Sequence, residues 1–153
     1  MLSHRDNHLR PVSLIILSTL LSLLMVACDV FDAAFNSEER DVIAAIDENL
    51  AAANAEDIPR YMATIHPESP LYATTEDLLR QINQTYDLSY EVSDLEVLSL
   101  SSGEARVAFT LTTRLIDGLA FRDNRVTGVF ILRRDNGQWK IYGQEIENIE
   151  YLD

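Results

Sequence analysis

Apolar residues recur every three to four positions in three consecutive segments of the chain, which predicts three helices. Asn36 or Ser37 can cap the first helix, Asp57 the second, and Thr74 or Thr75 the third. The apolar positions of the three segments are Val42, Ile43, Ile46, Leu50 and Ala53, then Ile58, Tyr61, Met62 and Ile65, then Leu78, Leu79, Ile82 and Tyr86.

After residue 87 the apolar period shortens to two, which predicts four strands over residues 88–100, 104–115, 126–134 and 139–152. The alternation breaks at Ser93-Asp94, as it does at a β-bulge. Asp135-Asn136-Gly137 is a hairpin turn sequence. Helices followed by strands indicate an α+β fold, with three helices packed on a curved four-stranded antiparallel sheet. Apolar residues on both faces of the second strand leave open which face of the sheet is buried.

The first 27 residues have the organisation of a secretory signal peptide. A polar segment with Arg5 and Arg10 precedes an apolar run over residues 12–27, which ends at Ala27. The run is shorter than the ~20 residues that span a bilayer, although an uncleaved anchor helix is the alternative. Ala27-Cys28, after apolar residues, resembles the cleavage and lipidation site of bacterial lipoproteins, and Cys28 is the single cysteine of the chain.

This resemblance implies that Cys28 is acylated and that cleavage occurs between Ala27 and Cys28. The lipidated residue and a short tether would occupy residues 28–36, followed by one domain over residues 37–153. Two or three acyl chains give stable anchoring to a bilayer. We therefore expect a bacterial envelope protein that faces outside the cytoplasm. Asp29 favours the inner membrane, and hence the periplasm, if the host is Gram-negative.

The charge balance excludes one class of partner. The chain has 25 Asp and Glu against 12 Lys and Arg, for a net charge of −13. Such a domain repels a phosphate backbone, so we expect no nucleic acid partner. A single cysteine cannot form an intramolecular disulfide.

Several segments of residues 37–152 resemble the nuclear transport factor 2-like superfamily, which includes the SnoaL-like polyketide cyclases. They are the junction 54–58, the strand 104–109, and the last hairpin, whose two halves are 125–130 and 136–141. The resemblance implies a cone-shaped fold, a cavity between sheet and helices, and homodimerisation through the sheet. The superfamily contains isomerases, dehydratases, cyclases and non-enzymatic modules, so the fold alone does not select a function.

Candidate site residues are few. His66 follows the second predicted helix and is the candidate general base at the cavity mouth, or else a cation placed at a helix C-terminus. Tyr61, Tyr90 and Phe109 are candidate pocket residues for a small apolar ligand. One histidine in the mature domain, with no cysteine cluster or HExxH motif, predicts no metal site. We expect no cofactor.

These observations favour a membrane-anchored, non-enzymatic module that binds a small ligand or another protein. One alternative is a small cofactor-free isomerase, dehydratase or cyclase that uses a pocket histidine or carboxylate. A second alternative is a structural partner of an envelope complex.

Replacing the lipidation residue tests the envelope assignment. Cys28→Ser should leave an unprocessed precursor that carries no lipid, because serine has no thiol to acylate. Mass spectrometry of the protein from the membrane fraction measures both changes. A mature product of normal mass from this variant would contradict lipidation at Cys28.

Overall fold

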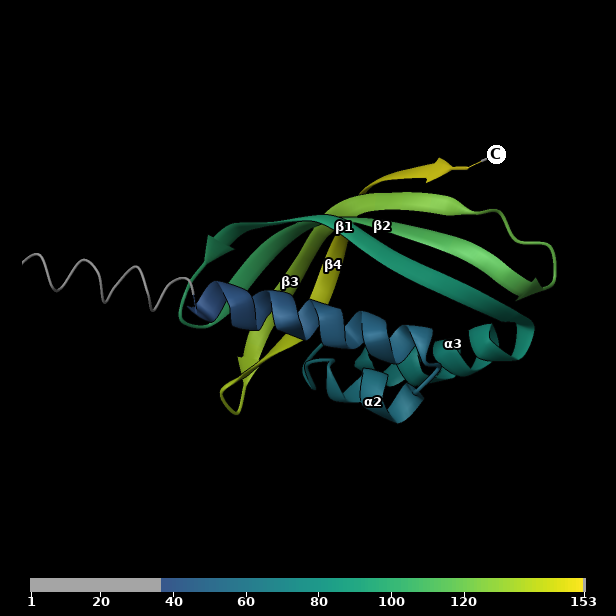
Figure 1. Cartoon of the computed structure of the whole chain (residues 1–153). Coiled ribbons are helices and arrows are strands. Elements are labelled where there is room, and N and C mark those ends of the chain that lie inside the picture. Colours follow the sequence, from purple (N-terminus) through teal and green to yellow (C-terminus); the bar gives the residue numbers. More distant parts are fainter. Residues whose placement is uncertain (1–36, 153) are drawn as a thin grey trace, which may run out of the picture. The chain divides into compact units, whose positions relative to one another are not determined.

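A computed structural model of the chain describes residues 37–152 (Figure 1). Within these residues three helices precede four strands, which confirms the predicted order of elements. The strands pair antiparallel in chain order, β1-β2-β3-β4. The elements are a first helix over residues 37–54, α2 (Ile58–Ala63), α3 (Tyr72–Thr85), β1 (Tyr86–Leu100), β2 (Glu104–Gly118), β3 (Asn124–Asp135) and β4 (Gln138–Tyr151).

Within the described residues, 39–152 form a compact unit with its own buried core. A region of that kind is expected to fold on its own. The predicted signal peptide (1–27) and lipidated tether (28–36) lie outside the described residues. No helix in the described part of the chain is long and apolar enough to cross a membrane.

The core forms where one face of the sheet meets the helices, which lie together on that side (Figure 1). Val107 and Phe109 of β2 are buried on this face, and Phe109 stacks on Phe130 of β3 with 4.1 Å between ring centroids. The first helix contributes Val42 and Ile46, both fully buried. The structure therefore identifies the buried face of the sheet as the one that carries Val107 and Phe109.

Two local features predicted from the sequence are confirmed. Asn136 and Gly137 both have positive φ, 50° and 84°, as a two-residue hairpin turn between twisted strands requires. The pairing of β1 with β2 shifts register between Ser93 and Glu96, and Asp94 has φ 54°. A bulge increases the local twist of a strand, so this one helps the sheet to curve around the helices.

The second helix ends earlier than the apolar pattern predicts. α2 ends at Ala63, and Ile65, which the pattern places on its apolar stripe, forms a parallel bridge with Ile141 of β4. The backbone N–H of Ile141 donates to the carbonyl of Thr64 at 2.9 Å, and that of His66 donates to the carbonyl of Ile141 at 2.8 Å. Pairing with the edge of the sheet thus takes the place of another helical turn.

The third helix begins earlier than predicted. It starts at Tyr72, with Leu71 as its N-cap, so Thr74 and Thr75 are not caps. Their hydroxyls donate to the carbonyl of Leu71 at 3.1 and 2.8 Å, which satisfies them within the first turn. Tyr86, which was expected on this helix, has extended backbone and begins β1.

β3 and β4 approach closely at Gly128. The register of this pair shifts between Thr127 and Gly128, which leaves an extra residue in β4 at that point. A Cβ atom on Gly128 would lie 2.2 Å from the carbonyl oxygen of Glu145. Only glycine fits there without a shift of the backbone.

Gly128→Ala should therefore lower the free energy of unfolding by about 1–3 kcal/mol, the usual range for overpacking. Gly143→Ala is the matched control on β4, because nothing lies within 4 Å of the added Cβ atom. It should change the stability by less than about 1 kcal/mol. Urea denaturation of residues 29–153 measures both variants, and equal stabilities would contradict the close approach.

Candidate functional site

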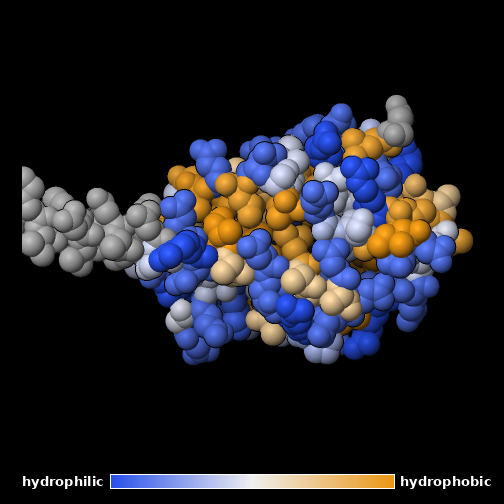
Figure 2. Space-filling view, in the orientation of Figure 1, coloured by the Kyte–Doolittle hydropathy of each residue, from blue (hydrophilic) through white to orange (hydrophobic). Residues whose placement is uncertain are grey.

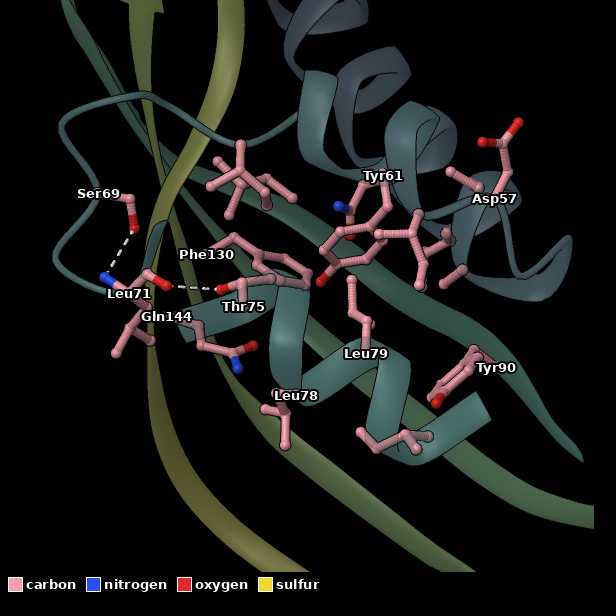
Figure 3. A pocket seen from close by; sticks show the side chains of 18 of the residues that line it. Asp57, Tyr61, Ser69, Leu71, Thr75, Leu78, Leu79, Tyr90, Phe130 and Gln144 are labelled. Carbon is pink, nitrogen blue, oxygen red and sulfur yellow. Dashed lines mark hydrogen bonds between the residues drawn. The ribbon is translucent and has the colours of Figure 1, made fainter. Parts of the chain in front are cut away.

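A cavity of about 280 Å³ lies between the helices and the buried face of the sheet (Figure 3). Every strand contributes to its lining, with Tyr90 from β1, Leu111 from β2, Phe130 from β3 and Gln144 from β4. The end of the first helix, α2 and α3 form the other walls. A mostly apolar lining with a few polar groups is typical of small-molecule sites.

α3 forms one wall of the cavity without being buried in the core. Leu78, Leu79 and Ile82 on its apolar side all line the cavity. None of the residues of α3 is buried, and Leu78 is 56% exposed. Burying a leucine or isoleucine side chain stabilises a protein by about 1.5–3 kcal/mol. The apolar side of α3 lacks part of this stabilisation, and a molecule bound in the cavity would supply it.

Tyr61 extends from α2 towards Phe130 and Leu79 (Figure 3). Burial raises the pKa of its hydroxyl, and a hydrogen bond with Asn49 opposes part of that rise. The amide of Asn49 in turn donates to the hydroxyl of Thr64 at 2.7 Å. The side chain of Asn49 beside Tyr61 is therefore held in place by Thr64. Because its pKa is raised, the Tyr61 hydroxyl stays neutral at physiological pH.

Tyr90 lies on β1, where the junction after the first helix meets the sheet. The side chain of Asn54 donates to the carbonyl of Tyr90 and accepts from its N–H, both at 2.8 Å. Burial, then Tyr61, then Glu56 raise the pKa of the Tyr90 hydroxyl. Two of the predicted pocket residues, Tyr61 and Tyr90, thus lie on the same cavity.

The other two candidates are not among the residues that line this cavity. Phe109 is 2% exposed and packs in the core behind Phe130. His66 is 6% exposed, and its Nδ1 accepts a hydrogen bond from the N–H of Glu68 at 3.1 Å. Its ring also meets the edge of Tyr142, with 5.7 Å between ring centroids. These contacts give His66 a structural role in the segment that follows α2 and pairs with β4.

Several polar residues that line the cavity were not predicted from the sequence, among them Asn49, Glu56 and Gln144. Glu56 and Asp57 are the only charged residues of the described lining, which contains no Arg, Lys or His. No group of three or more potential metal ligands occurs in the described part of the chain. The lining can therefore bind an apolar body and offer hydroxyl, amide and carboxylate groups to a polar end.

The opposite face of the sheet is polar. Thr110, Thr112 and Thr127 lie around a shallow hollow there together with Arg114 and Arg125. Arg125 forms an ion pair with Glu150 at 3.3 Å. Pairing of this face with a second copy of the chain stays a prediction.

Figure 2 shows apolar side chains grouped at the end of the domain where β2 leads into its connection with β3. Ile116 and Leu119 are large apolar residues in this region, 63% and 65% exposed. An exposed apolar group of this kind is compatible with a protein partner.

Solved structures with the same arrangement include a protein with a cystatin-like fold from Nostoc punctiforme, with 15% identity and a TM-score of 0.60 over 73% of this chain and 90% of that one. A ketosteroid isomerase-like protein from Erwinia carotovora atroseptica has 22% identity and a TM-score of 0.55, over 71% and 94%. A hexachlorocyclohexane dehydrochlorinase has 12% identity and a TM-score of 0.52, over 82% and 93%. At these identities the likeness shows the fold alone, and it confirms the nuclear transport factor 2-like, or cystatin-like, fold of residues 37–152.

Sequence comparison is more specific. The anti-sigma-I factor RsgI9 of Acetivibrio thermocellus is 32% identical over 104 residues, which are 67% of this chain and 14% of that protein. The chain thus spans about one seventh of the length of this relative. The family model of the anti-sigma-I factor RsgI9 C-terminal domain matches residues 44–152, well over half of the chain. The chain belongs to the family of the C-terminal domain of anti-sigma-I factor RsgI9.

Proposed function

We propose that this domain is an extracytoplasmic binding module that takes up a small, largely apolar molecule in the cavity beside α3. The observation that carries the proposal is the uncovered apolar side of α3. Leu78, Leu79 and Ile82 line a cavity instead of being buried against protein. An apolar guest would cover them and stabilise the helix.

Lipid attachment at Cys28 completes this proposal by holding the module at the outer side of the cytoplasmic membrane. Residues 28–36 then act as the tether. Cleavage removes Arg5, Asp6 and Arg10, which changes the net charge from −13 to −14. This charge repels anionic lipid headgroups, so the cavity stays accessible from the aqueous side.

The relative is named an anti-sigma-I factor, and the match covers 14% of its length. A binding module suits the C-terminal domain of a regulator, because a regulator must contact the molecule to which it responds. We assign ligand recognition to the present domain, and the assignment does not extend to inhibition of a sigma factor.

The geometry favours binding over acid–base catalysis. A general base must reach the reacting proton, directly or through one water, and His66 does not line the cavity. Isomerases of this fold class use carboxyl groups in apolar surroundings. The carboxylates of the described lining belong to Glu56 and Asp57, which are exposed residues.

Filling the cavity tests the proposal. Leu79→Trp enlarges a half-buried side chain that lines the cavity, so it should weaken binding of 1-octanol by about tenfold or more while the domain stays folded. Calorimetric titration of residues 29–153 measures the affinity, and thermal melting reports the fold. Leu98→Trp is the matched control, because Leu98 is 52% exposed and does not line the cavity.

Native mass spectrometry of the protein purified from the envelope provides the second readout. A small molecule bound in stoichiometric amount, and lost in Leu79→Trp, would support the module. Protein without such a molecule that also fails to bind 1-octanol would contradict it.

A further inference from the structure

The charges around the cavity restrict what it can bind. Glu56 and Asp57 are the only charged residues of its described lining. An anion moved out of water is costly unless a cation or several hydrogen-bond donors compensate it. The lining supplies no described Arg, Lys or His for that purpose, so a carboxylate or phosphate guest is disfavoured.

The carboxylate of Asp57 already serves as the N-cap of its own helix. It accepts from the N–H of Arg60 at 3.1 Å and caps α2. Figure 3 shows it at the margin of the lining residues, directed away from Tyr61. The guanidinium of Arg60 donates to the carboxylate of Glu48 at 2.6 and 2.8 Å, so this cation is already paired as well.

Glu56 is the carboxylate that remains available. No ion pair joins it to a cation within residues 37–152. Its backbone is held in the left-handed region, at φ 52°, by hydrogen bonds at 3.1 Å from its N–H to Ala53 and from the N–H of Ile58 to its carbonyl. A tight turn thus fixes the position from which this side chain reaches the cavity.

Tyr90 is joined to the segment that carries Glu56, because Asn54 hydrogen-bonds to both the N–H and the carbonyl of Tyr90 at 2.8 Å. Both residues line the cavity, and Glu56 contributes, after burial and Tyr61, to raising the pKa of the Tyr90 hydroxyl. A tyrosine ring attracts a cation that lies over its face. Glu56 and Tyr90 together therefore offer a carboxylate and an aromatic ring to the polar end of a guest.

We propose that the cavity selects molecules with an apolar body and a protonated amine at one end, and that Glu56 is the counter-ion of that amine. This inference rests on the proposed binding function and adds the chemical class of the ligand. The size of the body follows from the volume. A cavity of ~150 Å³ holds benzene, so a cavity of about 280 Å³ fits a body of roughly eight to twelve carbon atoms.

Three probes of equal chain length test the inference, namely octylamine, 1-octanol and octanoate. Calorimetric titration of residues 29–153 at pH 7 and low ionic strength measures each affinity, because salt screens exposed charges. At this pH the amine is protonated and the carboxylate is ionised. We expect octylamine to bind about fivefold more tightly than 1-octanol, and octanoate to bind most weakly.

Two variants with the same change in net charge separate a local effect from the general field of an acidic protein. Glu56→Gln should lower the ratio of octylamine to 1-octanol affinity to about one. Glu96→Gln should keep the ratio of the unmodified protein, because Glu96 is exposed on β1 and does not line the cavity.

Each other outcome overturns the inference in a recognisable way. If 1-octanol and octylamine bind equally well, or if octanoate binds best, the cavity binds apolar guests but does not select amines. If Glu96→Gln changes the ratio as much as Glu56→Gln does, the preference belongs to the net charge and not to Glu56. If none of the three probes binds, the binding function itself is wrong.

Discussion

Hydrogen bonds at the two free edges of the sheet hold the helical layer in place. At the β1 edge, Asn54 binds both the N–H and the carbonyl of Tyr90 at 2.8 Å. At the β4 edge, Ile141 exchanges hydrogen bonds with Thr64 and His66 at 2.9 and 2.8 Å. Edge strands expose unpaired backbone groups, and these contacts satisfy some of them on each side. Both contacts come from segments that precede α3, so the first helix and α2 are fixed to the sheet independently of α3.

The arrangement of α3 follows from this order. The chain leaves the β4 edge after residue 66 and must return to begin β1 at Tyr86, and α3 crosses that distance beside the cavity. Because none of its residues is buried, its stability depends on what lies against its apolar side. Segments with few buried contacts open most easily, and a ligand that binds only the folded state stabilises what it contacts. In the proposed function, ligand binding and the ordering of α3 are therefore coupled.

The sequence predicts those features that neighbouring residues determine. Alternation around Val107 and the Asn136-Gly137 turn are local patterns, and the structure agrees with both. The apolar pattern wrongly predicts that Ile65 lies on the second helix. The pairing that ends α2 involves Ile141, which is distant in the sequence. The cavity is predicted in part. Tyr61 and Tyr90 line it, whereas the position of Gln144 depends on register shifts between β3 and β4 that no local pattern reveals.

The chemistry of the lining, more than the fold, distinguishes binding from catalysis here. Structures with this fold and 12–22% identity include a dehydrochlorinase and an isomerase-like protein, so the same framework surrounds different chemistries. Acid–base enzymes of this kind place donors or positive charge where negative charge develops in the transition state. In the described lining a developing negative charge would meet the carboxylate of Glu56 and no basic side chain. Such walls stabilise a neutral or cationic guest better than an anionic intermediate. The uncovered side of α3 and the charges around the cavity therefore both support the proposed binding of a ligand over catalysis.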